Sequence, residues 1–221
     1  MRLISKVPTP PPLLDSLDPS VITWESGVPI YRVHGRQHDA LAFNRKQGLD
    51  FRFSSLSIDS RPIGVMYGAD QLIGAISETM FHTIPADGDR LKPRTIPRAN
   101  IEKFAVSIIA SHRPLRLIDL TGHGMGREGM PITHEELILS EAAHYANTRA
   151  WAETFYRHPL AVDGFIWVSR QYNLARAMML FDDRVEPDVL FLVEDTALAG
   201  RSPMIEIIET VAMEARIIIT N

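Results

Sequence analysis

Short runs of β-branched, aromatic and aliphatic residues recur along this chain of 221 residues, and they limit its fold more than any other feature. Runs of this composition, bounded by glycine, proline and polar residues, predict β-strands. The predicted strands cover residues 30–34, 51–57, 63–69, 102–111, 115–120, 164–169 and 189–194. Strands are too frequent, and long helical stretches too few, for a regular alternation of strand and helix. The sequence therefore predicts an α+β fold, with mixed or antiparallel sheets and flanking helices.

Helical patterns occur at two places. Apolar residues at helical spacing follow Asp70 and predict a helix over residues 71–83, which the Asp70 side chain can cap. Thr133 and Glu136 form a capping-box pattern at the start of one or two helices within residues 133–158. These helices are the expected cover of the sheets.

The rest of the chain divides into loops and one ambiguous stretch. Residues 88–100 are basic and broken by prolines, which predicts a loop, and the apolar residues 204–220 fit either a helix or a strand. Residues 1–28 contain the proline-rich run PTPPPLL and are predicted to form an extended arm. A single domain is expected over residues 29–221, because a chain of this length can bury one core of its own.

Composition indicates the cellular compartment of the protein and excludes some classes of partner. The chain contains no cysteine, which excludes disulfides and thiolate chemistry and fits a reducing cytoplasm. No apolar run approaches the roughly 18 residues of a membrane helix, and the N-terminus shows no signal-peptide pattern. A formal net charge of -4 argues against a protein that coats nucleic acid. We expect a cytoplasmic protein without direct contact with a membrane or with nucleic acid.

Two familiar motifs occur only in part. Residues 121–130, TGHGMGREGM, contain a formal G-x-G-x-x-G pattern, but Pro131 follows almost at once and the helix signal comes only at Thr133. A dinucleotide fingerprint needs its last glycine to enter a helix, so a flexible surface loop is the better interpretation. The segment HEELI begins like a zinc-protease motif, but the position four residues after His134 is Ile138. No other histidine has a familiar ligand spacing, and we expect no metal site.

Two arginines lie in apolar surroundings typical of strands, Arg32 in PIYRVH and Arg52 in DFRFSS. A guanidinium stays charged at any ordinary pH, so its burial is costly without an anion nearby. Both arginines therefore indicate an anionic ligand.

Four further polar residues have both a functional and a structural interpretation. Glu78, on the predicted helix, is either a solvated charge or a carboxylate at the mouth of a pocket that faces the arginines. Tyr67 lies in a predicted strand, where an aromatic residue more often belongs to the core. Ser169 and Arg170 end an apolar strand, where binding groups are common but a polar residue can also simply meet water.

As a set, these residues resemble the RES domain, a family named for its Arg, Glu and Ser, whose members are mostly the toxin halves of bacterial toxin–antitoxin pairs. The matching pieces occur in family order from Tyr31 to about Glu194. They are YRVH, FRFSS, VMYGAD with AISETMFH, LRLIDL, ANTRAWAE, and DGFIWVSR with ARAMMLF.

This resemblance implies a fold similar to that of ADP-ribosyltransferases and cleavage of the nicotinamide–ribose bond of NAD. By position, Arg32 and Arg52 match the two arginines of the family, Tyr67 the pocket tyrosine, Glu78 the glutamate and Ser169 the serine. NAD is then a substrate rather than a cofactor, and inorganic phosphate or water accepts the ADP-ribosyl group. Glu78, Arg32 and Arg52 are the expected catalytic residues, because guanidinium groups bind phosphate oxygens and a carboxylate stabilises an oxocarbenium-like ribose. The same two arginines, with Tyr67 to stack on a ring and Ser169 to bond a phosphate or ribose oxygen, are the expected substrate-binding residues.

The resemblance also implies a helix-turn-helix antitoxin that inserts into the NAD pocket and forms an oligomeric complex with the toxin. Two alternatives stay open. The first is a mono-ADP-ribosyltransferase that modifies a cellular protein through the same pocket. The second is a non-catalytic binding protein of the same fold.

Overall fold

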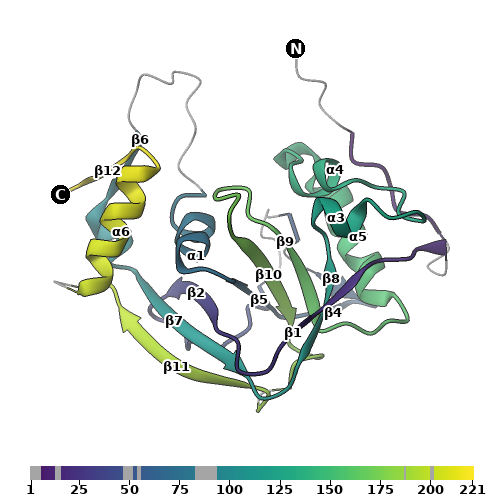
Figure 1. The fold of residues 1–221 in the computed structure, drawn as a ribbon, viewed down its shortest axis with the longest axis horizontal. Helices are drawn as coiled ribbons and strands as arrows, with labels where there is room; N and C mark the ends of the chain where they lie inside the picture. The colour runs from purple at the N-terminus through teal and green to yellow at the C-terminus, as the bar shows by residue number, and fades with distance from the viewer. Residues whose placement is uncertain are drawn as a thin grey trace.

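An eight-stranded, strongly curved sheet forms the centre of the computed structural model, which describes residues 6–12, 16–46, 52–53, 56–82, 94–186, 188–199 and 202–221 (Figure 1). The strand order is β1-β8-β9-β10-β5-β2-β7-β11. The bounds are β1 Val21–Trp24, β2 Ile30–Gly35, β5 Val65–Ala69, β7 Phe104–Ser111, β8 Leu115–Asp119, β9 Gly164–Val168, β10 Arg176–Phe181 and β11 Leu190–Ala197. Neighbouring strands are antiparallel except β8 and β9, which are parallel.

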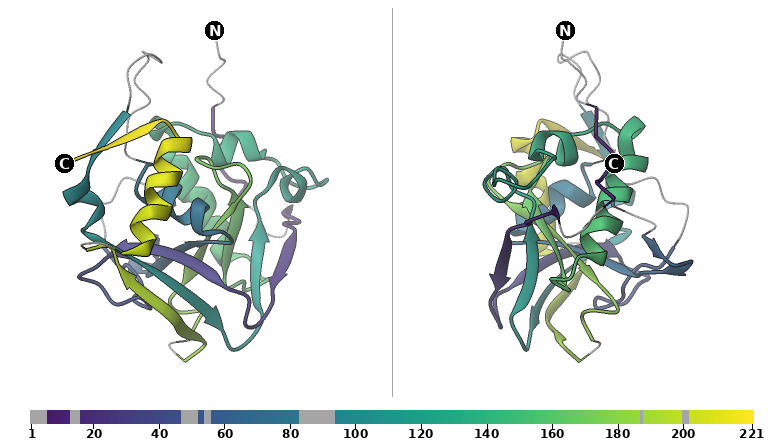
Figure 2. Two further views of the ribbon diagram at one scale, coloured as in Figure 1. Left: turned by 60° about the vertical axis from the view of Figure 1, so that its left-hand side comes forward. Right: turned by 90° about the vertical axis from the view of Figure 1, so that its right-hand side faces the viewer.

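The helices gather in two groups above this sheet. Figure 1 shows α1 and α6 on one side of the molecule and α3, α4 and α5 on the other, and Figure 2 shows the curvature of the sheet from two further directions. The bounds are α1 Leu72–Thr79, α2 Arg98–Ile101, α3 Gly122–Met125, α4 His134–Ile138, α5 Tyr145–Arg157 and α6 Pro203–Glu214. Two small sheets complete the fold, a parallel pair of β6 (Arg94–Pro97) with β12 (Ile217–Thr220) and a hairpin of β3 (Ser57–Ile58) with β4 (Arg61–Pro62). The predicted α+β class is confirmed.

Helix α5 packs on the sheet through a cluster of buried aromatic side chains. Trp151 and Phe155 are fully buried, and the Phe155 ring meets the Phe165 ring of β9 edge-on, with centroids 5.9 Å apart. The described part of the proline-rich segment packs against the same helix: Val7 is fully buried, and the indole Nε1 of Trp151 donates to the Pro8 carbonyl over 2.8 Å. Together with β1, this segment belongs to the packed structure.

Helix α1 is shorter than the one predicted over residues 71–83, and the prediction that Asp70 caps it was wrong. Helix α1 begins at Leu72, and its N-cap residue Gln71 makes no side-chain cap hydrogen bond. The Asp70 carboxylate instead accepts from the backbone N and the Nε of Arg176 on β10, over 2.7 and 2.9 Å. The Arg176 guanidinium offers this carboxylate a full positive charge, whereas a helix N-terminus offers only about half a charge. Residue 83 lies outside the described part of the chain.

Several loop predictions also need correction. The glycine-rich segment contains the short helix α3, which begins because the Thr121 side chain accepts from the Gly124 amide. The basic stretch 88–100 contains β6 and α2, with residues 88–93 outside the described chain. The ambiguous stretch 204–220 is helix and then strand, α6 followed by β12. In contrast, the capping box of Thr133 and Glu136 is confirmed, with both reciprocal bonds formed at α4.

The strand predicted over residues 51–57 is also wrong where the structure describes it. Arg52 and Phe53 lie in a turn, and only Ser57 of that range belongs to a strand, β3. Residues 51, 54 and 55 lie outside the described part. β1 and β10 had not been predicted as strands.

The β3–β4 hairpin provides a test of backbone strain. Both residues of its turn have left-handed φ angles, 51° at Asp59 and 66° at Ser60, as in a type I′ turn that glycine or asparagine favours. Asp59 also binds Arg157, so Ser60 is the residue to change. We expect Ser60→Gly to raise the free energy of unfolding by about 0.5–1 kcal/mol and the Tm by about 1–4 °C, measured by calorimetry.

Gly27 is the matched control for this prediction. Its φ is 76°, and a Cβ there would meet no atom within 4 Å, so Gly27→Ala changes the backbone preference alone. We expect Gly27→Ala to lower the Tm. A change in Tm of the same sign for Ser60→Gly and Gly27→Ala would contradict the argument from backbone strain.

Candidate functional site

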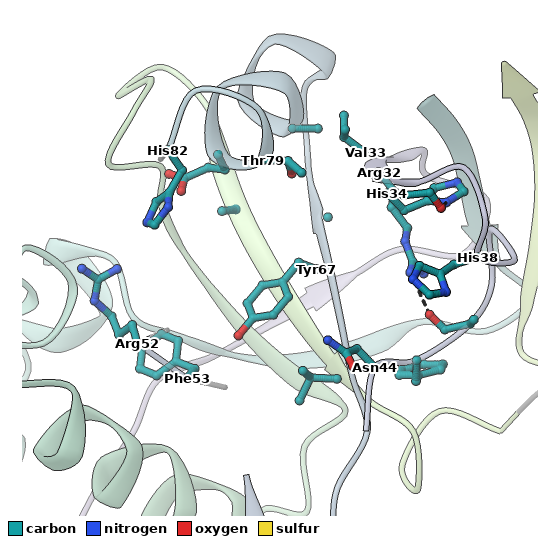
Figure 3. A pocket seen from close by; sticks show the side chains of 18 of the residues that line it. Arg32, Val33, His34, His38, Asn44, Arg52, Phe53, Tyr67, Thr79 and His82 are labelled. Carbon is teal, nitrogen blue, oxygen red and sulfur yellow. Dashed lines mark hydrogen bonds between the residues drawn. The ribbon is translucent and has the colours of Figure 1, made fainter. Parts of the chain in front are cut away.

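A cavity of about 550 Å³ opens between β2, β5, α1 and the segment that carries Arg52. This volume lies within the range of small-molecule sites. Arg32, Arg52, Tyr67 and Glu78 all line it. Figure 3 shows Arg32 with His34 and His38 on one side, Arg52 on the other and Tyr67 between them. The structure thus brings to one cavity four of the five residues that carry the resemblance stated above, Ser169 being the exception.

Arg32 reaches this cavity from the middle of β2 and is only 8% exposed. Its two terminal nitrogens donate to the carbonyls of Ala40 and Ala42, over 2.9 and 2.7 Å. Burial lowers the pKa of the Arg32 guanidinium to about 10, while the nearby Asp39 carboxylate acts in the opposite direction. The partners of Arg32 are neutral carbonyls, so its positive charge is not cancelled by an ion pair at these bonds.

Arg52 lies on the opposite side of the cavity. One of its terminal nitrogens donates to the Ser140 carbonyl over 3.1 Å, and its guanidinium lies over the Tyr145 ring, 5.4 Å from the centroid. Burial lowers the pKa of Arg52, and the Arg170 cation lowers it further, whereas Tyr145, Glu78 and Tyr67 act to raise it. The buried Nε of Arg52 has no hydrogen-bond partner among the described residues. A guanidinium held in this way is suited to an incoming anion.

Glu78 lies near the C-terminal end of α1, and its carboxylate is held by the turn that follows β9. Its Oε1 accepts from the Ser169 hydroxyl over 2.7 Å, from the Arg170 amide over 2.7 Å and from the Gln171 amide over 3.3 Å. Within the described chain, no donor bonds to Oε2. One oxygen therefore fixes the carboxylate, and the other is left for a ligand.

Ser169 itself lies behind the cavity wall. The residue is fully buried and does not line the cavity. Its Oγ donates to Glu78 and accepts from the Tyr172 amide over 3.0 Å. The structure therefore places Ser169 next to Glu78 rather than in contact with the cavity.

Tyr67 separates the two sides of the cavity. The residue is 37% exposed because its ring faces the open space, and the ring meets Trp167 edge-on with centroids 6.5 Å apart (Figure 3). The ring faces the cavity rather than the outer surface, so the surrounding protein desolvates the phenol and raises its pKa, whereas the Arg52 cation acts in the opposite direction. The phenol therefore stays protonated and can donate a hydrogen bond.

The sequence had not singled out His34, Tyr145 or Trp167, which also line the cavity. His34 follows Arg32 by two residues on β2, so strand alternation could have placed it on the same face. The sequence around Tyr145 gave no comparable signal, because this residue lies on α5, far from β2 along the chain. The described ranges hold no cluster of three or more His, Asp or Glu residues able to bind a metal, and none of their helices is long and apolar enough to cross a membrane.

The curved α+β fold thus surrounds a cavity lined by the buried Arg32, the half-buried Arg52 and one fixed carboxylate, a set of groups whose chemistry suits an anionic small molecule. Comparison with known families is more specific. The model of the RES domain matches residues 29–198, and the chain belongs to this family.

A solved structure agrees in fold. One chain of "the M.tuberculosis MbcT-MbcA toxin-antitoxin complex" superposes with a TM-score of 0.54 at 15% sequence identity, covering 87% of this chain and 92% of that chain. A search of curated proteins gave no match. Identity this low shows a common fold alone.

The bonds at Glu78 predict how two substitutions differ in stability. Glu78→Ala removes the acceptor of the buried Ser169 hydroxyl and of two backbone amides. We therefore expect the free energy of unfolding to fall by about 2 kcal/mol and the Tm by about 4–8 °C. Glu78→Gln keeps an acceptor at Oε1, and we expect less than half of that change. Equal melting temperatures for the two variants would contradict the assigned bonds.

Proposed function

We propose that this chain is the toxin of a toxin–antitoxin pair and that it degrades NAD by cleaving the nicotinamide–ribose bond, with phosphate or water as the acceptor. Membership of the RES family and a fold shared with a chain of a toxin–antitoxin complex support the class. The observation that carries the proposal is the convergence of Arg32, Arg52, Tyr67 and Glu78 on one cavity.

The two sides of the cavity suit the two ends of a dinucleotide. In the proposal, Arg32 binds the pyrophosphate, because its guanidinium is buried and its protein partners are neutral. Tyr67 lies between the two arginines, where its exposed ring can pack against the ligand. Arg52 lies near Glu78 and can orient a phosphate acceptor or a ribose oxygen.

The chemistry requires a positive charge to be stabilised at the ribose. As the bond from C1′ to the nicotinamide nitrogen breaks, its electron pair leaves with nicotinamide, which departs neutral, and C1′ acquires oxocarbenium character. The Oε2 of Glu78, which has no donor among the described residues, stabilises that charge, while Ser169 holds Oε1 in place as a positioning residue. An oxygen of phosphate or water then bonds to C1′, and an attacking water releases one proton to solvent.

Nicotinamide release from NAD tests this proposal. The purified protein, freed of any bound partner, is expected to release nicotinamide, and Glu78→Gln is expected to be at least about a hundredfold slower, because a transition-state charge loses its partner. Glu206→Gln is the matched control: this glutamate is exposed on α6, away from the residues that line the cavity, and should leave the rate unchanged.

The products identify the acceptor. Phosphate-dependent release with a phosphorylated ADP-ribose product indicates phosphorolysis, and free ADP-ribose without phosphate indicates hydrolysis. Label from NAD on protein would support the mono-ADP-ribosyltransferase instead. No nicotinamide release from wild type would contradict the proposed function.

The proposed partner is a helix-turn-helix antitoxin that occupies the cavity in an oligomeric complex. We expect expression of this chain alone to arrest bacterial growth, and co-expression with a small reading frame beside its gene to restore growth. Glu78→Gln should permit growth without that partner. If Glu78→Gln arrested growth as strongly as wild type, toxicity would not depend on the cavity, and the proposal would be contradicted.

A further inference from the structure

A chain of polar side chains crosses three adjacent strands, from the cavity wall to the outer edge of the sheet. His34 on β2 lines the cavity, Ser107 on β7 is fully buried, and Asp195 lies on the edge strand β11. The His34 Nε2 lies 2.7 Å from the Ser107 Oγ, and that hydroxyl donates to the Asp195 carboxylate over 2.6 Å. The His34 Nδ1 lies 3.2 Å from the Gly35 carbonyl.

These three contacts constrain the protons of His34. Ser107 has one hydroxyl hydrogen and donates it to Asp195, so its oxygen must accept from a protonated Nε2 of His34. A carbonyl only accepts, so the contact with Gly35 requires a proton on Nδ1 as well. A neutral ring would leave one nitrogen lone pair directed at another lone pair. With Asp195 present as a carboxylate that accepts from Ser107, only the imidazolium form satisfies all three contacts.

The Asp195 carboxylate supplies the matching negative charge. Its Oδ1 lies 3.5 Å from the His34 Nε2, close enough for an ion pair. The His34 side chain is 5% exposed and the Asp195 side chain 42% exposed. Solvent therefore screens the carboxylate more strongly than the imidazolium, and the positive end of the pair faces the cavity.

We propose that His34 is a fixed imidazolium that, with Arg32, forms a subsite for the phosphate oxygens of the ligand, and that Ser107 and Asp195 hold His34 in this state. Arg32 and His34 are two residues apart on β2, so their side chains share one face, and both line the same side of the cavity (Figure 3). The proposal rests on the proposed function for the identity of the ligand as NAD. His34 thereby determines specificity for a ligand that carries phosphate.

The ring nitrogens of His34 report its charge directly. In protein labelled with ¹⁵N in the histidine rings at neutral pH, we expect both His34 nitrogens to give protonated signals, assigned by their loss in His34→Gln. Asp195→Asn should convert one of them to the unprotonated signal. A neutral ring in wild type would overturn the proposal.

Binding of inorganic pyrophosphate tests the subsite without NAD. We expect Asp195→Asn to weaken pyrophosphate binding by about three- to tenfold, measured by calorimetry, because His34 loses its proton. The matched control is Glu194→Gln, which removes the neighbouring carboxylate of β11, bonded to the Thr196 hydroxyl and not to His34. Direct repulsion between a carboxylate and the anion would give the opposite sign, with tighter binding in both variants.

His34→Gln gives a second measurement, since it removes the charge while keeping hydrogen-bonding groups, and it should weaken pyrophosphate binding to a similar degree. Unchanged binding in both Asp195→Asn and His34→Gln, with melting temperatures near wild type, overturns the subsite. If wild type binds pyrophosphate in this way but releases no nicotinamide from NAD, the proposed function fails and the subsite stands. If wild type releases nicotinamide but the affinity for pyrophosphate is unchanged in His34→Gln, the subsite fails and the proposed function stands.

Discussion

The carboxylate of Glu78 joins two parts of the chain on which the cavity depends. Its Oε1 accepts from Ser169, Arg170 and Gln171, which begin the turn after β9, while α1 holds its backbone. A helix end is thereby tied to a sheet turn about 90 residues further along the chain. A carboxylate with three donors on one oxygen has a fixed direction, and this fixes where the second oxygen can act.

The arginines of the cavity differ from those held in ion pairs. Some arginines of the described chain pair with carboxylates, as Arg113 does with Asp163 and Arg176 with Asp70. Arg32 and Arg52 bind carbonyl oxygens instead, at Ala40, Ala42 and Ser140. A carbonyl orients a guanidinium without cancelling its charge, so a chain with net charge -4 can still present a positive cavity.

The helix that carries Glu78, α1, packs against a part of the chain that lies beyond the residues matched by the RES family. The RES model ends at residue 198, whereas α6 and β12 follow it. Ile208 and Val211 of α6 are buried in the same apolar cluster as Ile76 of α1. Burial of this kind fixes the position of a short helix, because an isolated helix of two turns has little stability of its own.

Local patterns in the sequence determined the elements whose signals are local. Strand composition predicted β2, β5, β7, β8, β9 and β11, and the pair Thr133 and Glu136 predicted the start of α4. The residue types Arg32, Arg52, Tyr67 and Glu78, taken in order, also indicated one anion-binding site through their resemblance to a family. Each of these inferences uses neighbours within a few residues or the identity of a side chain.

Only the tertiary structure decided which partners those side chains take. Asp70 binds Arg176 rather than capping α1, Ser169 lies behind Glu78, and His34 reaches Asp195 through a serine on the strand between them. In each case the partner is distant in the chain, and the bond that forms depends on which groups folding brings within about 3 Å and removes from water. Spacing along a sequence carries no information about that competition, so the chemistry of the residues could be predicted but their contacts could not.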